Sequence, residues 1–558
     1  MYLSVCSKTF CHAAAILVVT AGASHAETPL HERIDAAIGV GNAEFEKVAA
    51  DDVGDAGFAR RIYLDLVGTI PSAEQARQFL MDETPDKRAK LIDKLLASPQ
   101  HARRMQYVFD AMLMERRPDK HVKADEWRSY LRQSFAQNKS WDQLVTEILT
   151  ADGSDEQSRP AARFLLDREM KMDDMTRDLG RIFLGRDLQC AQCHDHPNID
   201  DYLQRHYHGL AAFLNRSYLF TDPKSKKASI GEKAEGAVKF TSVFTNESAE
   251  TPPRLLDLPP IEDPPAAEEA YTVKPEKKVR SVPVYSRRLQ LAAAMTDPSN
   301  VAFRENIANR LWAMMTGRGI VEPVDMWHAE NPPSNPELLD LLADALADNN
   351  FDMRYLLREI AQSKTYQRSS QYRDGAESVS EGRFAVALLK PLSPEQLAWS
   401  MMQATGLIDQ TLDDLKKKHV GGDAEGDSEQ VDDPLWQEEA LHDALKGHVN
   451  TFVALFGVIG IQTSRFDASA NQALFLRNGE VVQSWLAPSG QRLTAHLKTL
   501  DDSKRIDEFY FSVFSRPPCV EEVEQVTHFL EENGDNRDVA IGQLVWAALS
   551  SAEFRFNH

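Results

Sequence analysis

The stretch SNPELLDLLADAL, residues 334–346, carries the pattern that decides the fold class. Its leucines and alanines recur three and four residues apart, which is the spacing of one face of an α-helix. Ser334 and Glu337, in front of this run, match a capping box, in which two side chains supply partners to backbone N–H groups at a helix start. The stretch therefore predicts an amphipathic helix that begins near residue 334.

The same start signal recurs along the chain, at 72–75, 140–143 and 393–396, and the last of these has Pro394 at the first helical position. Strand-like alternation is scarce, and residues 238–244 are the best candidate. Between residues 222 and 285 the chain is rich in Pro, Lys and Glu, which is typical of a linker or an extended excursion. We therefore predict a mostly α protein, with helical domains at 27–221 and 286–558 joined by a Pro-rich, partly β segment at 222–285.

Composition narrows the class of protein further. The chain has 558 residues, of which 42% are hydrophobic and 27% charged, as expected for a folded protein of more than one domain. Its formal net charge of −22 disfavours a nucleic-acid partner, because phosphate backbones attract the opposite sign. No apolar run reaches the roughly 18 residues that span a bilayer. Five cysteines are too few for a disulfide scaffold.

The N-terminus predicts export. Lys8 is the only charged residue of the first 26, a short apolar stretch runs from Ala13 to Val19, and Ser24 and Ala26 place small residues at a cleavage site. This is the layout of a signal peptide over residues 1–26. Its removal would take away Lys8, Cys6 and Cys11, and would leave a chain of net charge −23 with three cysteines. We expect a soluble exported protein, in the periplasm or at the cell surface.

One motif carries chemistry. Cys190-Ala191-Gln192-Cys193-His194 is C-x-x-C-H, the attachment signature of c-type haem. Two thiols at this spacing can each bond one vinyl group of a porphyrin, and the adjacent imidazole then meets the iron from the proximal side. A composition with 5 Cys and 16 His in 558 residues gives on the order of 0.001 such matches by chance. The predicted cofactor is covalent haem c, held by Cys190, Cys193 and His194.

Two other chemistries compete for this motif. A redox or structural disulfide between Cys190 and Cys193 would want a βαβ setting, which the flanking sequence does not provide. A zinc site would draw on His206 and His208, but a single residue separates them where a zinc finger has three to five. Both alternatives stay open at this stage.

The sequence does not identify the residue that would be the sixth ligand of such a haem. Met170, Met172 and Met175 lie upstream of the motif, and His206 and His208 lie downstream, with none favoured over the others. Three isolated carboxylates could serve acid–base roles, but such residues are usually caps or solvated charges, and we interpret them so: Asp65, Asp195 and Asp201.

Several stretches together resemble a known pair of domains. The stretches are 60–71, 91–99, 141–144 and 183–197 in the first block, and 309–312, 317–322, 333–339, 472–475 and 550–558 in the second. With these stretches the first block resembles the planctomycete cytochrome-type (PSCyt) domain of unknown function of large exported proteins, and the second resembles its usual partner (PSD) domain. The resemblance implies a helical two-domain exported protein with a haem c, and it implies no activity.

These observations favour an exported c-type haem protein that transfers electrons. The acidic charge suggests an exported redox partner with a basic surface. Two other classes remain: a cell-surface binding or scaffold module with a structural C-x-x-C or zinc site, and a haem-dependent oxidoreductase, so enzymatic activity is left open.

Overall fold

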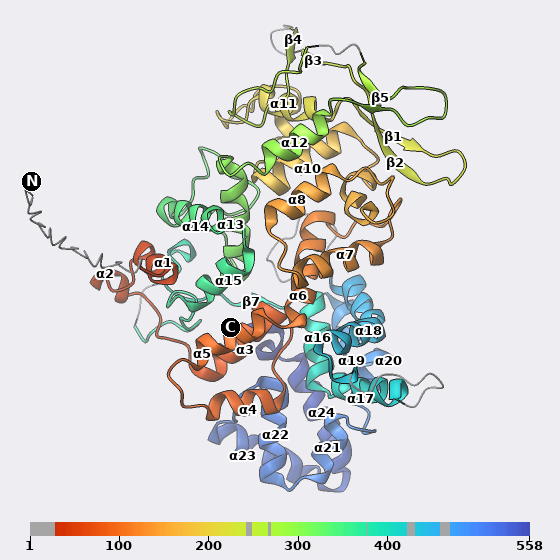
Figure 1. Cartoon of the computed structure of the whole chain (residues 1–558). Helices are drawn as coiled ribbons and strands as arrows, with labels where there is room; N and C mark the ends of the chain where they lie inside the picture. The colour runs from red at the N-terminus through yellow and green to blue at the C-terminus, as the bar shows by residue number, and fades with distance from the viewer. Residues whose placement is uncertain (1–27, 242–247, 266–268, 376–377, 421–429, 458–468) are drawn as a thin grey trace, which may run out of the picture.

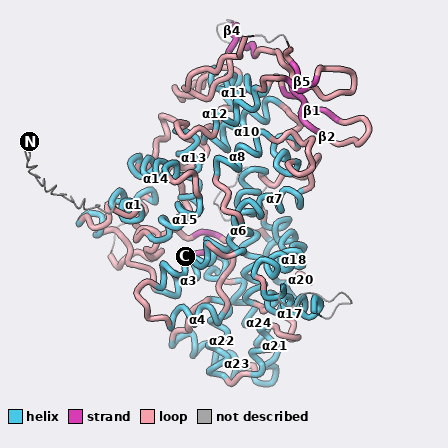
Figure 2. The backbone as a smooth tube through the Cα atoms, viewed as in Figure 1, coloured by secondary structure: helices cyan, strands magenta, loops and turns pink. Residues whose placement is uncertain are grey.

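The computed structural model describes residues 28–241, 248–265, 269–375, 378–420, 430–457 and 469–558. Within these residues it has 25 α-helices, and strands pair only as four two-stranded sheets. Most of the strands gather at one end of the molecule (Figure 2). The prediction of a mostly α fold with a partly β segment is confirmed. The signal peptide predicted at 1–26 lies outside the described residues.

The first helical region runs from residue 30 to residue 214. Its α-helices are α1 (Leu30–Ile38), α2 (Ala43–Glu46), α3 (Asp55–Val67), α4 (Ala73–Met81), α5 (Lys87–Leu96), α6 (Pro99–Met114), α7 (Ala124–Ala136), α8 (Trp141–Thr150), α9 (Arg163–Leu166), α10 (Met172–Leu184) and α11 (Gln204–Leu214). Two 3-10 helices, η1 (Arg159–Ala162) and η2 (Gln189–Gln192), flank α9 and α10.

Three antiparallel hairpins follow. They pair β1 (Ser217–Thr221) with β2 (Ala228–Glu232), β3 (Val238–Thr241) with β4 (Ser248–Thr251), and β5 (Tyr271–Val273) with β6 (Val282–Pro283). The strand predicted at 238–244 is β3 in its first four residues, and residues 242–244 lie outside the described part of the chain.

The second helical region runs from residue 287 to residue 557. Its α-helices are α12 (Arg287–Met295), α13 (Val301–Thr316), α14 (Pro336–Asp348), α15 (Met353–Gln362), α16 (Pro394–Ala404), α17 (Leu407–Val420), α18 (Pro434–Phe456), α19 (Ala470–Asn478), α20 (Glu480–Leu486), α21 (Leu493–Thr499), α22 (Asp502–Phe514), α23 (Val520–Glu532), α24 (Arg537–Ser550) and α25 (Ala552–Arg555). The fourth sheet pairs β7 (Lys390–Pro391) with β8 (Phe556–Asn557), and the 3-10 helices are η3 (Glu381–Arg383), η4 (Gln430–Asp432) and η5 (Gly534–Asn536).

Two of the four predicted capping boxes are present in the structure. Those of Ser72 and Ser393 are present, with reciprocal bonds to Gln75 and Gln396. Ser334 is not the cap of α14, because its hydroxyl donates to the carbonyl of Ile320 and Asn335 caps the helix instead. Ser140 precedes α8 but makes no capping bond, and Trp141 N–H donates to Phe351 O at 3.1 Å.

Two large apolar clusters form the core, and they do not follow chain order. The first holds buried residues from Leu30 to Phe384, so helices α12–α15 complete the core of the first helical region. The second runs from Leu397 to Phe554 and also takes Leu64 and Ile70 from the first region. In Figure 1, α13–α15 accordingly lie beside α1 and α8, while α4 lies beside the C-terminal helix α22. The predicted domain division at 222 and 286 stays a prediction.

Trp141 is a buried member of the first cluster that contacts several other aromatic rings. Its ring is buried and lies 5.3 Å from Phe109, 5.9 Å from Phe183 and 6.1 Å from Phe303, measured between ring centroids. These rings come from α6, α10 and α13, so one side chain joins helices of both regions. Aromatic contacts of this kind add about 0.5–1.5 kcal/mol each to the stabilisation from buried area. Among the described residues, no helix is both long and apolar enough to cross a membrane.

Candidate functional site

The C-x-x-C-H motif lies on a short turn between α10 and α11. Helix α10 ends at Leu184 and is capped by Gly185, whose φ of 66° is a left-handed conformation that favours glycine. The carboxylate of Asp187 then accepts a hydrogen bond from Gln189 N–H at 3.1 Å, at the start of η2. Cys190 and Cys193 are exposed on and just after η2, and neither takes part in a disulfide. Both thiols are therefore accessible from solvent on one turn of chain.

His194 makes a hydrogen bond that defines its tautomer. Its Nδ1 lies 2.7 Å from the carbonyl oxygen of Asp195. A carbonyl oxygen only accepts hydrogen bonds, so Nδ1 carries the proton and the ring lone pair of the neutral imidazole is on Nε2. A bond from one ring nitrogen to a backbone carbonyl is the common way in which a metal-ligating histidine is oriented.

A small apolar cluster lies beneath the turn. Its buried members come from the motif segment and from α11, and they are Leu188, Ala191, Ile199, Tyr202 and Tyr207. This cluster is separate from the two large cores. The motif thus rests on a local apolar base.

Helix α11 is tied to the motif by polar contacts. The carboxylate of Asp195 accepts a hydrogen bond from Gln204 N–H, at the start of α11, at 2.7 Å. One turn later, His208 Nε2 donates to the carbonyl of Gln192 at 3.1 Å, and its ring stacks on Phe240 with centroids 4.4 Å apart. Asp195 is a cap, as interpreted from the sequence, and α11 fixes the main chain between the two cysteines.

The other candidate ligands are occupied elsewhere in the fold. His206 is buried and its Nε2 lies 3.0 Å from Asp257. Desolvation lowers the pKa of His206, and the bond to Asp257 opposes that shift. Met170 and Met175 are buried in the first large cluster, and Met172 packs against it. His208 is the histidine that lies against the motif.

Residues 326–329 of the second helical region, here called the strap, contact the chain on both sides of the motif. Trp327 N–H donates to Gly185 O at 3.0 Å, and the guanidinium of Arg186 lies 3.1 Å from the centre of the indole. Tyr202 donates its hydroxyl to Trp327 O at 3.0 Å, and Asp201 accepts a hydrogen bond from Ala329 N–H. Asp201 therefore binds a turn of the second helical region and does not cap a helix. Sequence reasoning missed the strap, because its contacts join residues more than 120 positions apart.

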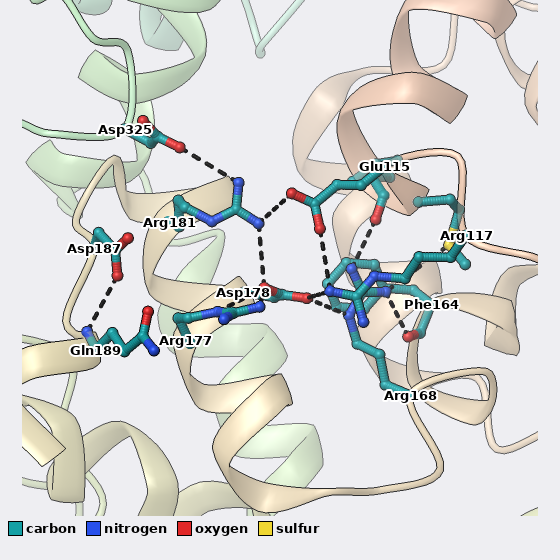
Figure 3. A network of polar contacts seen from close by, with 12 residues as sticks. Glu115, Arg117, Phe164, Arg168, Arg177, Asp178, Arg181, Asp187, Gln189 and Asp325 are labelled. Carbon is teal, nitrogen blue, oxygen red and sulfur yellow. Dashed lines mark hydrogen bonds and ion pairs between the residues drawn. The ribbon is translucent and has the colours of Figure 1, made fainter. Parts of the chain in front are cut away.

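A buried network of arginines and carboxylates supports the last turns of α10, ahead of the motif (Figure 3). Asp178 lies at its centre and has no exposed side-chain surface. It accepts hydrogen bonds from Arg168 and Arg117 at 2.8 Å and from Arg181 at 3.2 Å. Desolvation raises the pKa of Asp178, but the arginines, led by Arg168, lower it more, and the pKa falls below its ordinary value.

Asp65 departs from its interpretation as a cap or solvated charge. Its carboxylate is buried and forms an ion pair with Lys390 at 2.6 Å. The partner comes from β7, 325 residues away, so no local pattern could have indicated the pair.

The described part of the chain contains neither the zinc site nor the disulfide of the two alternatives. There, no three His, Cys, Asp or Glu side chains are placed to hold a metal ion, and the three cysteines are free thiols.

Comparison with known proteins places two family domains on this geometry. Residues 33–218 match PSCyt2, a protein of unknown function (DUF1549), and residues 287–530 match PSD1, a protein of unknown function (DUF1553). No curated protein and no solved structure matches the chain. The motif and its turn therefore lie in the PSCyt2 domain, and the strap lies in PSD1. The chain belongs to the proteins in which a PSCyt2 domain is followed by a PSD1 domain.

Proposed function

We propose that this protein is an exported c-type haem protein that transfers electrons. The observation that carries the proposal is the pair of exposed, unbridged thiols of Cys190 and Cys193 on one turn, next to a histidine whose proton is on Nδ1. When bound, a haem c supplies reversible one-electron chemistry at its iron.

The residues of the turn fit the attachment. Thioether formation needs both thiols free and accessible, and both are. Iron ligation needs a ring lone pair on the histidine, and the bond from His194 Nδ1 to Asp195 O assigns that lone pair to Nε2. The buried apolar side chains of Leu188 and Ala191 give the turn a water-excluding base. In this proposal Cys190 and Cys193 hold the group, and His194 is the proximal ligand.

The charge of the chain supports the choice of partner. A net charge of −22 before processing projects a negative field, which raises the encounter rate with a positively charged surface. The proposed partner is an exported redox protein with a basic surface patch.

The first experiment tests for the covalent group. The full chain is produced with a haem c maturation system, denatured and precipitated with acid. The pellet should keep its Soret absorbance, and the protein mass should exceed the apo mass by one haem. The double variant Cys190→Ala/Cys193→Ala should lose both signals. Cys519→Ser, which changes the third free and exposed thiol, is the matched control and should keep them.

The outcomes separate the competing functions. A colourless protein that contains zinc would overturn the proposal in favour of a zinc site. A haem protein that shows no reversible redox titration would point to the scaffold class. Binding of an added ligand to the reduced iron would favour a haem-dependent oxidoreductase over electron transfer. His194→Ala should change the iron spectrum yet keep attachment, because the bonds to the porphyrin are made by the thiols.

A further inference from the structure

The Pro-rich segment between the two helical regions contains two turns that are rich in lysine. The first turn, residues 222–227, joins β1 to β2, and the second, residues 274–281, joins β5 to β6. Together these two turns, here called the basic turns, hold six lysines and one arginine against two acidic residues, Asp222 and Glu276. A chain of net charge −22 therefore concentrates positive charge at this place.

The two basic turns belong to one surface. The backbone N–H of Glu232 donates to Ser281 O at 3.2 Å, and Arg280 Nη1 donates to Ile230 O at 3.0 Å, so the second hairpin packs along β2 of the first. In Figure 1 both turns project on the same side of the strand-bearing end of the molecule, beyond the helices. Their positive charges therefore act on the same region of solvent.

Most of the charge of the basic turns has no partner in the described structure. Lys227 pairs with Glu156, and Arg280 pairs with Asp152 at 2.5 Å. Asp222 accepts backbone N–H bonds from Lys224 and Ser225 at 2.9 and 2.7 Å, which hold the first turn in shape. The other lysines are exposed and form no ion pair with a described carboxylate, and they are Lys224, Lys226, Lys274, Lys277 and Lys278.

Apolar side chains are exposed among these charges. Val273, Val279 and Val284, in or beside the β5–β6 hairpin, are 38%, 39% and 62% exposed. The hairpin thus presents both ammonium groups and apolar side chains to solvent. This combination is typical of surfaces that bind an anionic bilayer, where the charges attract the headgroups and the apolar side chains enter the boundary with the acyl chains.

We propose that the basic turns bind the protein to an anionic lipid bilayer. A lysine is a point charge on a flexible stem, so a set of lysines suits mobile headgroups, whereas a fixed planar anion is better matched by an arginine fork. The exposed valines favour a lipid surface over a soluble polyanion, which offers them no apolar environment. The acidic remainder of the chain is repelled by the same surface, and this repulsion orients the molecule with its strand-bearing end toward the bilayer. Binding by these turns does not depend on a haem at the motif.

The test is co-sedimentation of the full chain with lipid vesicles. Vesicles of phosphatidylcholine that contain phosphatidylglycerol are compared with vesicles of phosphatidylcholine alone. We expect binding to the anionic vesicles at about 0.1 M salt and little at about 1 M, because the Debye length falls from about 10 Å to about 3 Å. The neutral vesicles should not sediment the protein at either salt concentration.

Two variants and a control assign the effect to the basic turns. Lys277→Gln/Lys278→Gln should weaken binding to the anionic vesicles about tenfold or more, since each lysine near such a surface strengthens binding about fivefold. Val279→Ser should weaken it several-fold and keep its salt dependence, because an apolar contact is lost and no charge changes. Lys417→Gln/Lys418→Gln is the matched control: it removes the same charge from two exposed lysines in the last turn of α17 and should bind as the unmodified protein does.

Three outcomes would overturn the proposal. The first is an absence of binding, or equal binding to neutral and anionic vesicles. The second is an equal loss of binding in the control Lys417→Gln/Lys418→Gln, which would make the effect one of net charge alone. The third is self-association of the chain, or retention on heparin, that needs Lys277 and Lys278 while vesicles are not bound. The basic turns would then bind a second copy of the chain or an acidic polysaccharide.

Discussion

Replacing Asp178 by Asn should destabilise the protein strongly while leaving the shape of the side chain almost unchanged. Asp178 and Arg168 both have side chains that are 0% exposed, and Asp178 is the acidic partner of Arg168 in the described structure. Asn removes the charge and also turns one acceptor oxygen into a donor that faces guanidinium N–H groups (Figure 3). Glu115 and Asp325 remain, and both already pair with Arg181.

The magnitude follows from the buried, unpaired charge that is left. Breaking a buried ion pair by removing one partner costs about 3–5 kcal/mol. Urea unfolding at pH 7, followed by circular dichroism, should show that the free energy of unfolding falls by that amount in the transition that reports the first apolar cluster, as a lower midpoint at an unchanged slope. Asp187→Asn is the matched control, since Asp187 is half-exposed and accepts one backbone N–H, and it should change the stability by no more than about 0.5 kcal/mol.

The pH dependence of the free energy of unfolding gives a second test of the role of Asp178. The pKa of Asp178 is lowered in the folded protein, so its contribution is present above the unfolded pKa of about 3.9 and is lost as pH falls below it. Asp178→Asn should therefore flatten the acid arm of the stability profile. If the variant loses less than about 1 kcal/mol, the carboxylate does not hold the arginines together and the network argument fails.

Three further predictions concern other parts of the chain. Burial lowers the pKa of His101 to about 4 against its bond to Leu66 O, so the stability that its neutral ring contributes is lost as pH falls from 6.5 toward 4. His101→Asn should reduce the difference between urea midpoints at pH 7 and pH 5, and an unchanged difference would contradict it. Cys519→Ser should raise the stability by up to about 1 kcal/mol in urea unfolding, because Ser is a better N-cap for α23 than Cys; a loss of stability would count against that role. Reduced haem-loaded protein should pass electrons faster to a basic than to an acidic cytochrome at low salt, and stopped-flow rates should converge as salt rises, because the Debye length is about 10 Å at 0.1 M. Equal rates at low salt would assign the acidic charge to solubility alone.

The sequence predicted those features that depend on residues close together in the chain. The caps at Ser72 and Ser393 bond to residues three positions away, and both were found from spacing alone. The cap at Ser334 was misplaced by one residue because its hydroxyl has a competing acceptor at Ile320, across 14 positions. A start signal read from spacing holds only where no distant group offers the hydroxyl a different partner.

The pairing of buried charges, in contrast, could not be predicted from local spacing. An isolated aspartate in a sequence is most often a cap, and Asp195 is one, but Asp65 is buried with partners 301, 325 and 492 residues away. The sequence gives no sign of such a pairing, because Asp65 stands at no regular spacing from any of its three partners. The pairing of Asp65 therefore follows from the structure alone, although two of the stretches that meet there, 60–71 and 550–558, were already prominent in the sequence.

The candidate haem site also has one part that the local sequence predicts and another part that depends on distant contacts. Attachment chemistry needs only the local order of two thiols and an imidazole, and residues 190–194 supply it within five positions. The surroundings of the motif depend on contacts that span the chain, since Tyr202 and Arg186 are fixed by Trp327, a residue of the PSD1 domain. Hydrogen bonds and burial around a haem set its reduction potential. The PSCyt2 domain carries the motif, so the PSD1 domain, through its strap, takes part in setting the environment in which any electron transfer at that motif occurs.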